Sequence, residues 1–144
     1  MKNIILSLFS VFILTLVLNC SASKVDNQHY RREWMMVSFD QFTKLQLVEN
    51  KAGINLTGER TGNRVKGFAT MGCNRIFFTA ELKNNSKINI SEIGSTEMVC
   101  KNMELENAFM KKIGNMKNYL IEGHRLTLSD NNGNEMKFIA ADWD

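Results

Sequence analysis

Hydrophobic and polar residues alternate along most of the chain in short runs that end at glycine, asparagine or aspartate. Such alternation is typical of β-strands with one buried face. It predicts about 7–8 strands, at residues 33–39, 53–57, 64–70, 75–82, 87–93, 118–122, 125–129 and 135–141. Asn132-Gly133 separates the last two runs and favours a tight hairpin, because type I′ turns need positive φ. We therefore expect the last three strands to form an antiparallel meander.

One stretch, residues 102–113, departs from the strand pattern. Its hydrophobic residues recur at helical spacings, so that one face of a helix can be buried. These residues are Leu105, Ala108, Phe109 and Ile113. Acidic residues near the start and lysines near the end suit the helix dipole, and Asn102 can cap the start. The pattern predicts an α+β fold in which a small antiparallel sheet packs against one α-helix.

The first residues have the composition of an export signal. Lys2 precedes an apolar run over residues 4–18, which is shorter than the roughly 20 residues of a membrane-spanning helix. Cleavage as a signal peptide is therefore expected, with residues 1–19 removed. Asn19-Cys20 ends the run, and Cys20 resembles the lipidated cysteine of bacterial lipoproteins. The alternative is an ordinary signal peptide cleaved near residues 21–23, with Cys20 discarded.

The lipoprotein interpretation adds a lipidated tether over residues 20–31 and one domain over residues 32–144. Removing the signal peptide takes away one of 18 basic residues and none of the 15 acidic residues, which leaves a net charge of +2. Acidic residues separate the basic ones, so a solvated surface is expected and nucleic-acid binding is not. Ser21 rather than an aspartate follows Cys20, which resembles the pattern of outer-membrane lipoproteins.

Cys73 and Cys100 lie in the polar body of the chain. In an oxidising envelope they are expected to form one disulfide, which would join a strand boundary to the start of the helix. The alternative is that Cys73 is a nucleophile or a redox centre. The two cysteines lack C-x-x-C spacing, however, and His29 and His124 give no zinc-ligand spacing with them. We therefore expect no metal, no cofactor and no catalytic residue.

Eight of the nine methionines lie beyond the leader. Flexible thioether side chains fill irregular cores, and they also line adaptable binding surfaces. Core filling is the favoured interpretation. The alternative is an apolar cleft beside the helix, with Met36, Phe68, Phe78 and Phe138 facing an opening.

Several short motifs follow one another in an order that resembles the META domain of HslJ-like bacterial proteins. The resemblance spans residues 33–139. It rests on Trp34 in the first strand, Gly67-Phe68, Gly72-Cys73-Asn74-Arg75, Thr96-Glu97-Met98-Val99-Cys100, and Glu106 and Phe109 on the helix. The Gly-Cys-Asn and Thr-x-Met-x-Cys elements are specific in combination. The resemblance implies a small antiparallel sheet, curved like an open barrel, with a helix packed against it.

The resemblance implies a location more clearly than an activity. Members of this family are often membrane-anchored or exported, and some are linked to heat shock or antibiotic tolerance. We therefore predict a non-catalytic, lipid-anchored protein of the bacterial cell envelope, at the outer membrane, that acts as a stress-related binding or stability module. Its expected partners are the membrane, through the lipid anchor, and an envelope protein or a hydrophobic ligand.

Two other functions stay open. The first is a pilotin-like carrier that binds a lipid or a hydrophobic peptide. The shape of the fold supports this role by analogy alone. The second is an envelope thiol enzyme or hydrolase. The alternative location is the periplasm or the medium, for a protein that is exported without an anchor.

Overall fold

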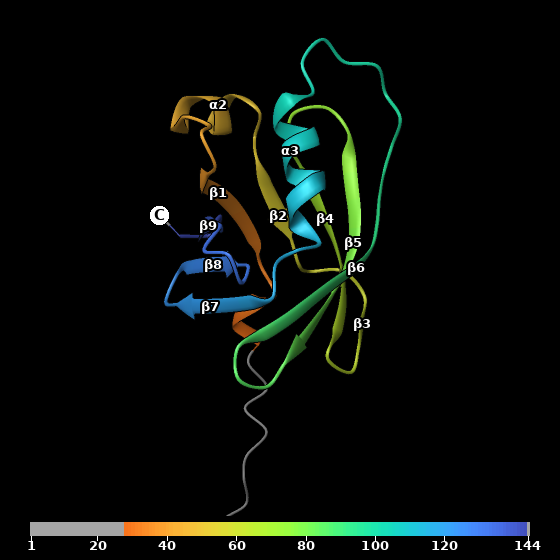
Figure 1. Ribbon diagram of the computed structural model, residues 1–144. Coiled ribbons are helices and arrows are strands. Elements are labelled where there is room, and N and C mark those ends of the chain that lie inside the picture. Colours follow the sequence, from red (N-terminus) through yellow and green to blue (C-terminus); the bar gives the residue numbers. More distant parts are fainter. Residues whose placement is uncertain (1–27, 144) are drawn as a thin grey trace, which may run out of the picture.

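The computed structural model describes residues 28–143, in which nine strands and two α-helices follow one another in sequence (Figure 1). The strands are β1 (Glu33–Phe39), β2 (Gly53–Asn55), β3 (Arg60–Thr61), β4 (Arg64–Thr70), β5 (Arg75–Lys83), β6 (Lys87–Ser95), β7 (Asn118–Glu122), β8 (Arg125–Ser129) and β9 (Glu135–Ala140). The helices are the 3₁₀ turn η1 (Gln28–Tyr30), α2 (Lys44–Glu49) and α3 (Glu104–Ile113). Within these residues, none of the helices is long and apolar enough to cross a membrane. The predicted leader and Cys20 lie outside the described residues.

The strands form a closed antiparallel barrel because β2 pairs on both of its sides. Neighbouring strands follow the order β2-β1-β9-β8-β7-β6-β5-β4, and β2 then returns to β4 through register pairs such as Gly53↔Thr70 and Asn55↔Phe68. β3 pairs only with β4 and stays outside this ring. The predicted α+β class, a small curved antiparallel sheet with a helix packed against it, is confirmed. The barrel is closed rather than open, which leaves few exposed strand edges.

The expected meander of the last three strands is present, since β8 pairs with β7 on one side and with β9 on the other. The turn between β8 and β9 differs from the predicted type I′ turn, because Gly133 (φ 87°) has a positive φ and Asn132 does not. Asp130 organises this turn instead. Its carboxylate accepts hydrogen bonds from the backbone N–H groups of Asn132 (2.8 Å) and Asn134 (2.9 Å).

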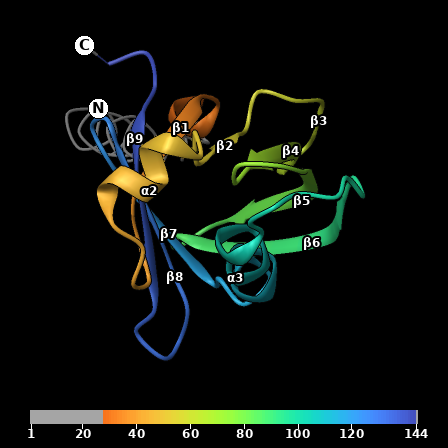
Figure 2. The same ribbon diagram turned by 90° about the horizontal axis from the view of Figure 1, so that it is seen from above.

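The predicted helix corresponds to α3, with Leu105, Phe109 and Ile113 on its buried face. The expectation that Asn102 is the N-cap is wrong, because Met103 occupies that position and makes no side-chain capping bond. Asn102 lies one residue earlier, and its Oδ1 accepts a hydrogen bond from Glu104 N at 3.0 Å. The sequence pattern does not predict α2, so the expectation of one helix is wrong. Only six residues long, α2 begins with a capping box between Thr43 and Gln46 and buries only Leu47. Figure 2 shows α2 beside β1 and α3 on another side of the barrel.

The hydrophobic core fills the inside of the barrel and the face of the sheet under α3. Its largest fully buried side chains are Trp34, Phe39, Phe109, Phe138, Leu47, Met71, Ile76, Ile113, Met116, Leu126, Leu128 and Met136. Phe39 meets Phe109 of α3 edge to face, with ring centroids 6.3 Å apart. Tyr30, which precedes the expected domain start at residue 32, is also buried in the core.

Candidate functional site

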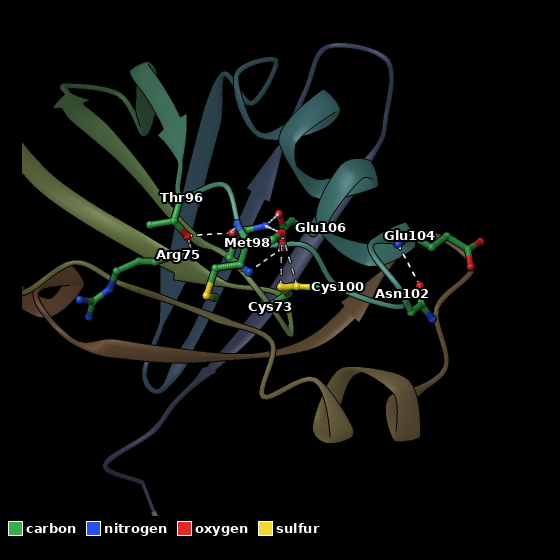
Figure 3. Close-up of a disulfide and its surroundings, with 9 residues drawn as sticks. Cys73, Arg75, Thr96, Met98, Cys100, Asn102, Glu104 and Glu106 are labelled. Atoms are coloured by element: carbon green, nitrogen blue, oxygen red, sulfur yellow. Dashed lines mark hydrogen bonds between the residues drawn. A yellow bond between two sulfur atoms is a disulfide. The ribbon is translucent and has the colours of Figure 1, made fainter.

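The Gly-Cys-Asn and Thr-x-Met-x-Cys motifs meet in one polar cluster where β5 begins, which we call the Asn74 cluster (Figure 3). Its members are Cys73, Asn74, Thr96, Met98, Cys100 and Glu106. Asn74 is 1% exposed, and its Oδ1 accepts hydrogen bonds from Thr96 Oγ1 (2.8 Å) and Met98 N (2.7 Å). Its Nδ2 donates to Glu106 Oε1 (2.8 Å) and to Met98 O (3.3 Å). Asn74 thereby ties the segment between β6 and α3 to the barrel.

Glu106 is a buried carboxylate, 3% exposed, whose two oxygens both accept hydrogen bonds. Oε2 accepts from Asn74 N and Oε1 from Asn74 Nδ2, each at 2.8 Å. Glu106 lies in the first turn of α3, where the helix dipole favours a negative charge. Because a buried carboxylate without partners is costly, these hydrogen bonds hold the start of β5 against α3.

A disulfide joins Cys73 to Cys100, as the cysteine count predicts. Their Cα atoms are 6.3 Å apart, within the usual range for a disulfide. It links the residue before Asn74 to the residues that lead into α3, so the bond and the hydrogen bonds of Asn74 act on the same segment (Figure 3). In this oxidised state the two sulfur atoms are bonded to each other, and Cys73 has no thiol that could act as a nucleophile.

Four other residues of the family motif lie outside the Asn74 cluster and have packing roles. Trp34 is buried and its Nε1 donates to Tyr30 O at 2.9 Å. Gly67 faces the ring of Phe78, where a Cβ would come within 2.7 Å of a ring carbon. Gly72 has a φ of 116°, a conformation that favours glycine, and Phe109 lies in the core.

The titratable groups of residues 28–143 form no cluster typical of a metalloenzyme. Among residues 28–143, no three His, Cys, Asp or Glu side chains are placed to hold a metal ion. His124 shares a hydrogen bond with Arg32 (3.2 Å) and stacks on Trp143 at a centroid distance of 5.0 Å. The pKa of Glu92 is lowered by the hydroxyl of Thr79 and by the guanidinium of nearby Arg64, which is a local surface effect.

The inside of the barrel is filled with side chains. The hollow between its interior residues, which include Phe78 and Ile113 of α3, has a volume of about 10 Å³. A hollow of this size holds no more than a water molecule. Met36, Phe78 and Phe138 are buried, and only Phe68 of the four candidate cleft residues is partly exposed. The cleft beside the predicted helix is therefore absent from the described residues.

Methionine residues contribute mainly to the core, as the favoured interpretation predicts. Four of them are buried: Met36, Met71, Met116 and Met136. Met35 and Met98 are exposed instead. The thioethers thus fill the irregular interior of the barrel, and they do not form a continuous binding surface.

A larger hollow lies on the outside of the barrel, and we call it the α2 groove. Its volume is about 310 Å³, and α2, β1, β2 and β4 surround it. The residues that line it are Glu33, Trp34, Met35, Met36, Leu47, Val48, Lys51, Ala52, Gly53, Ile54, Asn55, Phe68, Thr70 and Ala141. Most of these residues are apolar, and the charged ones are Glu33 and Lys51. The groove is the candidate binding site of this domain.

The two charged residues of the α2 groove differ in whether their side chains have hydrogen-bond partners. Glu33 Oε1 accepts a hydrogen bond from Asn55 Nδ2 at 2.6 Å, and Asn55 in turn accepts from Thr57. The ammonium group of Lys51 forms no ion pair or hydrogen bond with any described residue. Next to the groove, the guanidinium of Arg75 stacks on the ring of Phe68, 3.8 Å from its centroid.

Sequence reasoning missed the residues that form the α2 groove, apart from Met36 and Phe68 among the cleft candidates. The missing signal was α2 itself. The spacing of Thr43 and Gln46 is a capping-box pattern and marks the start of a helix, but a helix of six residues is too short for hydrophobic periodicity. Unless α2 is predicted, the sequence gives no reason to place Val48 and Lys51 beside β2 and β4.

The fold and the Asn74 cluster define a class of protein: a small closed antiparallel barrel, with a helix fixed to it by a disulfide and a buried Asn–Glu pair. The sequence model of the META domain matches residues 27–143, and the chain belongs to this family. No curated protein matches the chain. Nothing in these comparisons indicates catalysis.

Two solved structures are similar to the barrel. One is the NMR structure of a protein from Burkholderia xenovorans, with 17% sequence identity and a TM-score of 0.59 over 78% of this chain and 83% of that one. The other is also an NMR structure, with 20% identity and a TM-score of 0.55 over 78% of this chain and 91% of that one. At these identities the two structures support the fold alone.

Proposed function

We propose that this chain is a non-catalytic, lipid-anchored META-domain protein of the bacterial cell envelope, which acts as a stress-related binding or stability module. The observation that carries the proposal is the Asn74 cluster. The side chains of the polar motif residues Asn74, Thr96 and Glu106 form hydrogen bonds with one another and with the backbone. These internal bonds support a structural role for the three residues. Groups that serve catalysis are instead directed at a substrate.

The disulfide supports the envelope location. Structural disulfides persist in oxidising compartments and are rare in the cytosol. An apolar leader that ends at Cys20 supports export followed by lipidation at the outer membrane. The membrane, reached through this anchor, is then the first partner of the protein, and an envelope protein or hydrophobic ligand is the second.

An intact mass measurement tests the anchor and the disulfide together. The full-length chain is expressed in a bacterial host, and the purified mature form is weighed before and after reduction. We expect a chain that starts at Cys20, carries a diacylglyceryl group and gains two hydrogens on reduction. Cys20→Ala is the matched control and should lack the lipid. An unlipidated chain that starts after Cys20 would refute the anchor, and two free thiols before reduction would revive the reactive-cysteine alternative.

A pilotin-like carrier of a lipid or hydrophobic peptide is the second candidate function, and the α2 groove favours it. The filled barrel leaves no space for a ligand inside, so a carrier would have to bind on its outer surface. A deletion strain separates the two candidates. If the protein acts as a carrier, Val48→Asp in the groove wall should abolish complementation under heat stress, whereas a pure stability module should tolerate it.

A further inference from the structure

One row of cross-strand partners in the barrel wall lines the α2 groove. Met35 of β1, Gly53 of β2 and Thr70 of β4 are cross-strand partners in one row. Gly53 lies in the middle of this row, and a Cβ there would meet the backbone oxygen of Trp34 at 2.6 Å. Val48 of α2, which is 62% exposed, also lines the groove. The volume of about 310 Å³ lies at the lower end of the range for small-molecule sites, which is roughly 300–1,000 Å³.

The two ends of the groove differ in charge. Glu33 and Asn55 are cross-strand partners at one end, and Lys51 precedes β2 at the other end. The four steps along the backbone from Lys51 to Asn55 span about 13 Å in an extended chain. Asn55 occupies one oxygen of Glu33, whereas the ammonium of Lys51 has no partner among the described residues. A ligand in this groove therefore meets an unpaired cation at one end and an acidic residue at the other.

The backbone conformation of Lys51 makes glycine a useful replacement at this position. Its φ of 48° lies in the left-handed region, which glycine and asparagine adopt at much lower cost than lysine. Asp40, Asn85, Ser86 and Glu92 also have a positive φ and lie outside the groove, so the case for binding rests on the charge and position of Lys51. Lys51 follows the C-cap residue of α2, where glycine is the usual choice.

The paired backbone of the groove floor and the small volume of the groove exclude some classes of ligand. An added peptide strand needs unpaired backbone groups, but β1 pairs with β2 and β9, β2 with β1 and β4, and β4 with β2, β3 and β5. A helix satisfies its own backbone, but at about 10 Å in diameter a 13 Å segment occupies roughly 1,000 Å³. An acyl chain needs no hydrogen bonds and is much thinner.

We propose that the α2 groove binds a single-chain anionic amphiphile, namely a free long-chain carboxylate. The carboxylate pairs with the ammonium of Lys51, and the acyl chain lies along Met35, Val48 and Phe68. Glu33 fixes the orientation, because it repels the anionic head from the opposite end. The inference concerns the folded domain and does not depend on the lipid anchor, so its failure would leave the proposed envelope role untouched.

Calorimetric titration tests this binding. The sample is the chain from residue 20 onward, which contains the whole barrel, with Cys20→Ser so that no attached lipid competes. Dodecanoate is added below its micelle concentration, and we expect saturable binding at one site. Lys51→Gly should weaken binding about two- to fivefold, the effect of one exposed ion pair. It should also raise the melting temperature by about 2–5 °C, because glycine relieves the left-handed backbone.

Two exposed residues of α2 provide a matched comparison for the groove wall. Val48 lines the groove, whereas Leu45, 65% exposed on the same helix, does not. Val48→Asp should weaken dodecanoate binding at least tenfold, because the acyl chain would then meet a charge, and Leu45→Asp should leave it within twofold. Dodecylammonium tests the charge. It should bind more weakly than dodecanoate, and Lys51→Gly should strengthen its binding.

Several outcomes would overturn the proposal. They are the absence of saturable dodecanoate binding, equal affinity for dodecylammonium, and equal effects of Val48→Asp and Leu45→Asp. Phosphatidylglycerol vesicles check for a membrane-docking surface in place of a ligand site. Vesicle binding that both aspartate substitutions abolish, without saturable dodecanoate binding, would assign the face to the membrane and refute the carboxylate site.

Discussion

Replacing Asn74 by alanine should destabilise the barrel more than the loss of an ordinary polar residue. The side chain of Asn74 makes four hydrogen bonds and is 1% exposed. One of these bonds is donated to the buried carboxylate of Glu106, and the others hold Thr96 and Met98. Asn74→Ala removes all of them and leaves one oxygen of Glu106 without its donor.

The expected cost follows from the nature of the four bonds. A hydrogen bond to a charged group contributes about 1.5–3 kcal/mol, and a bond between neutral groups about 0.5–1.5 kcal/mol. Thr96 and Met98 are exposed residues, so water can replace Asn74 for them and their share of the loss is small. We therefore expect Asn74→Ala to lower the free energy of unfolding by about 2–4 kcal/mol.

Urea denaturation followed by circular dichroism measures this loss, with the disulfide intact and the m-value compared between variants. Asn63→Ala is the matched control. Asn63 is exposed and donates a single hydrogen bond, to Glu81 at 3.3 Å, so its replacement should cost less than about 0.5 kcal/mol. A double-mutant cycle between Asn74→Ala and Glu106→Ala should give a coupling energy of about 1.5–3 kcal/mol.

A loss below about 1 kcal/mol for Asn74→Ala, or a coupling energy near zero, would refute this reasoning. It would mean that the Asn74 cluster does not hold the start of β5 against α3. The disulfide alone would then fix this segment, and the case for a structural role of the family motif would fail.

Three further predictions concern other parts of the domain. Replacing Cys73 and Cys100 by alanine should cost about 3.6 kcal/mol, from the entropy of a closed loop of about 28 residues, and should make urea denaturation insensitive to reductant. Gly67→Ala should cost about 1–3 kcal/mol in the same assay, because its Cβ would crowd the ring of Phe78; a loss near zero would mean that the wall yields easily. The pKa of Glu92 is lowered by the hydroxyl and the guanidinium beside it, so its stabilisation is complete well above the ordinary value of 4.5 and is lost as the pH falls through the lower folded value. Glu92→Gln should therefore flatten the loss of stability below pH 4.5, and an unchanged acid slope would contradict this assignment.

Local patterns in the sequence predicted the elements whose information is contained within a few residues. The spacing of Leu105, Phe109 and Ile113 defines the buried face of α3, and the alternation in β7, β8 and β9 defines the meander. Each of these elements is long enough, or close enough to its partner along the chain, for its own pattern to specify its environment. The cysteine count likewise predicted the disulfide.

Short elements escaped prediction because they contain too few residues for a period to be visible. α2 has six residues and β3 has two, and neither was predicted. β2 was predicted within residues 53–57, but its short pattern did not reveal that it pairs with both β1 and β4 and thereby closes the barrel. The type I′ turn failed for a related reason. Asp130 offers its carboxylate to the turn backbone, and this side-chain contact outweighs the preference of the Asn-Gly pair.

By itself, the sequence determined the α+β class, the buried faces of the long elements and the pairing of Cys73 with Cys100. Only the tertiary structure decided that Asn74 meets Glu106, 32 residues away, and that an unfilled volume lies outside the barrel. The physical reason is that periodicity reports which way a side chain points. It does not report which distant strand the side chain meets, or whether neighbouring side chains fill the space around it, because both depend on long-range pairing and on the summed volumes of residues far apart in the chain.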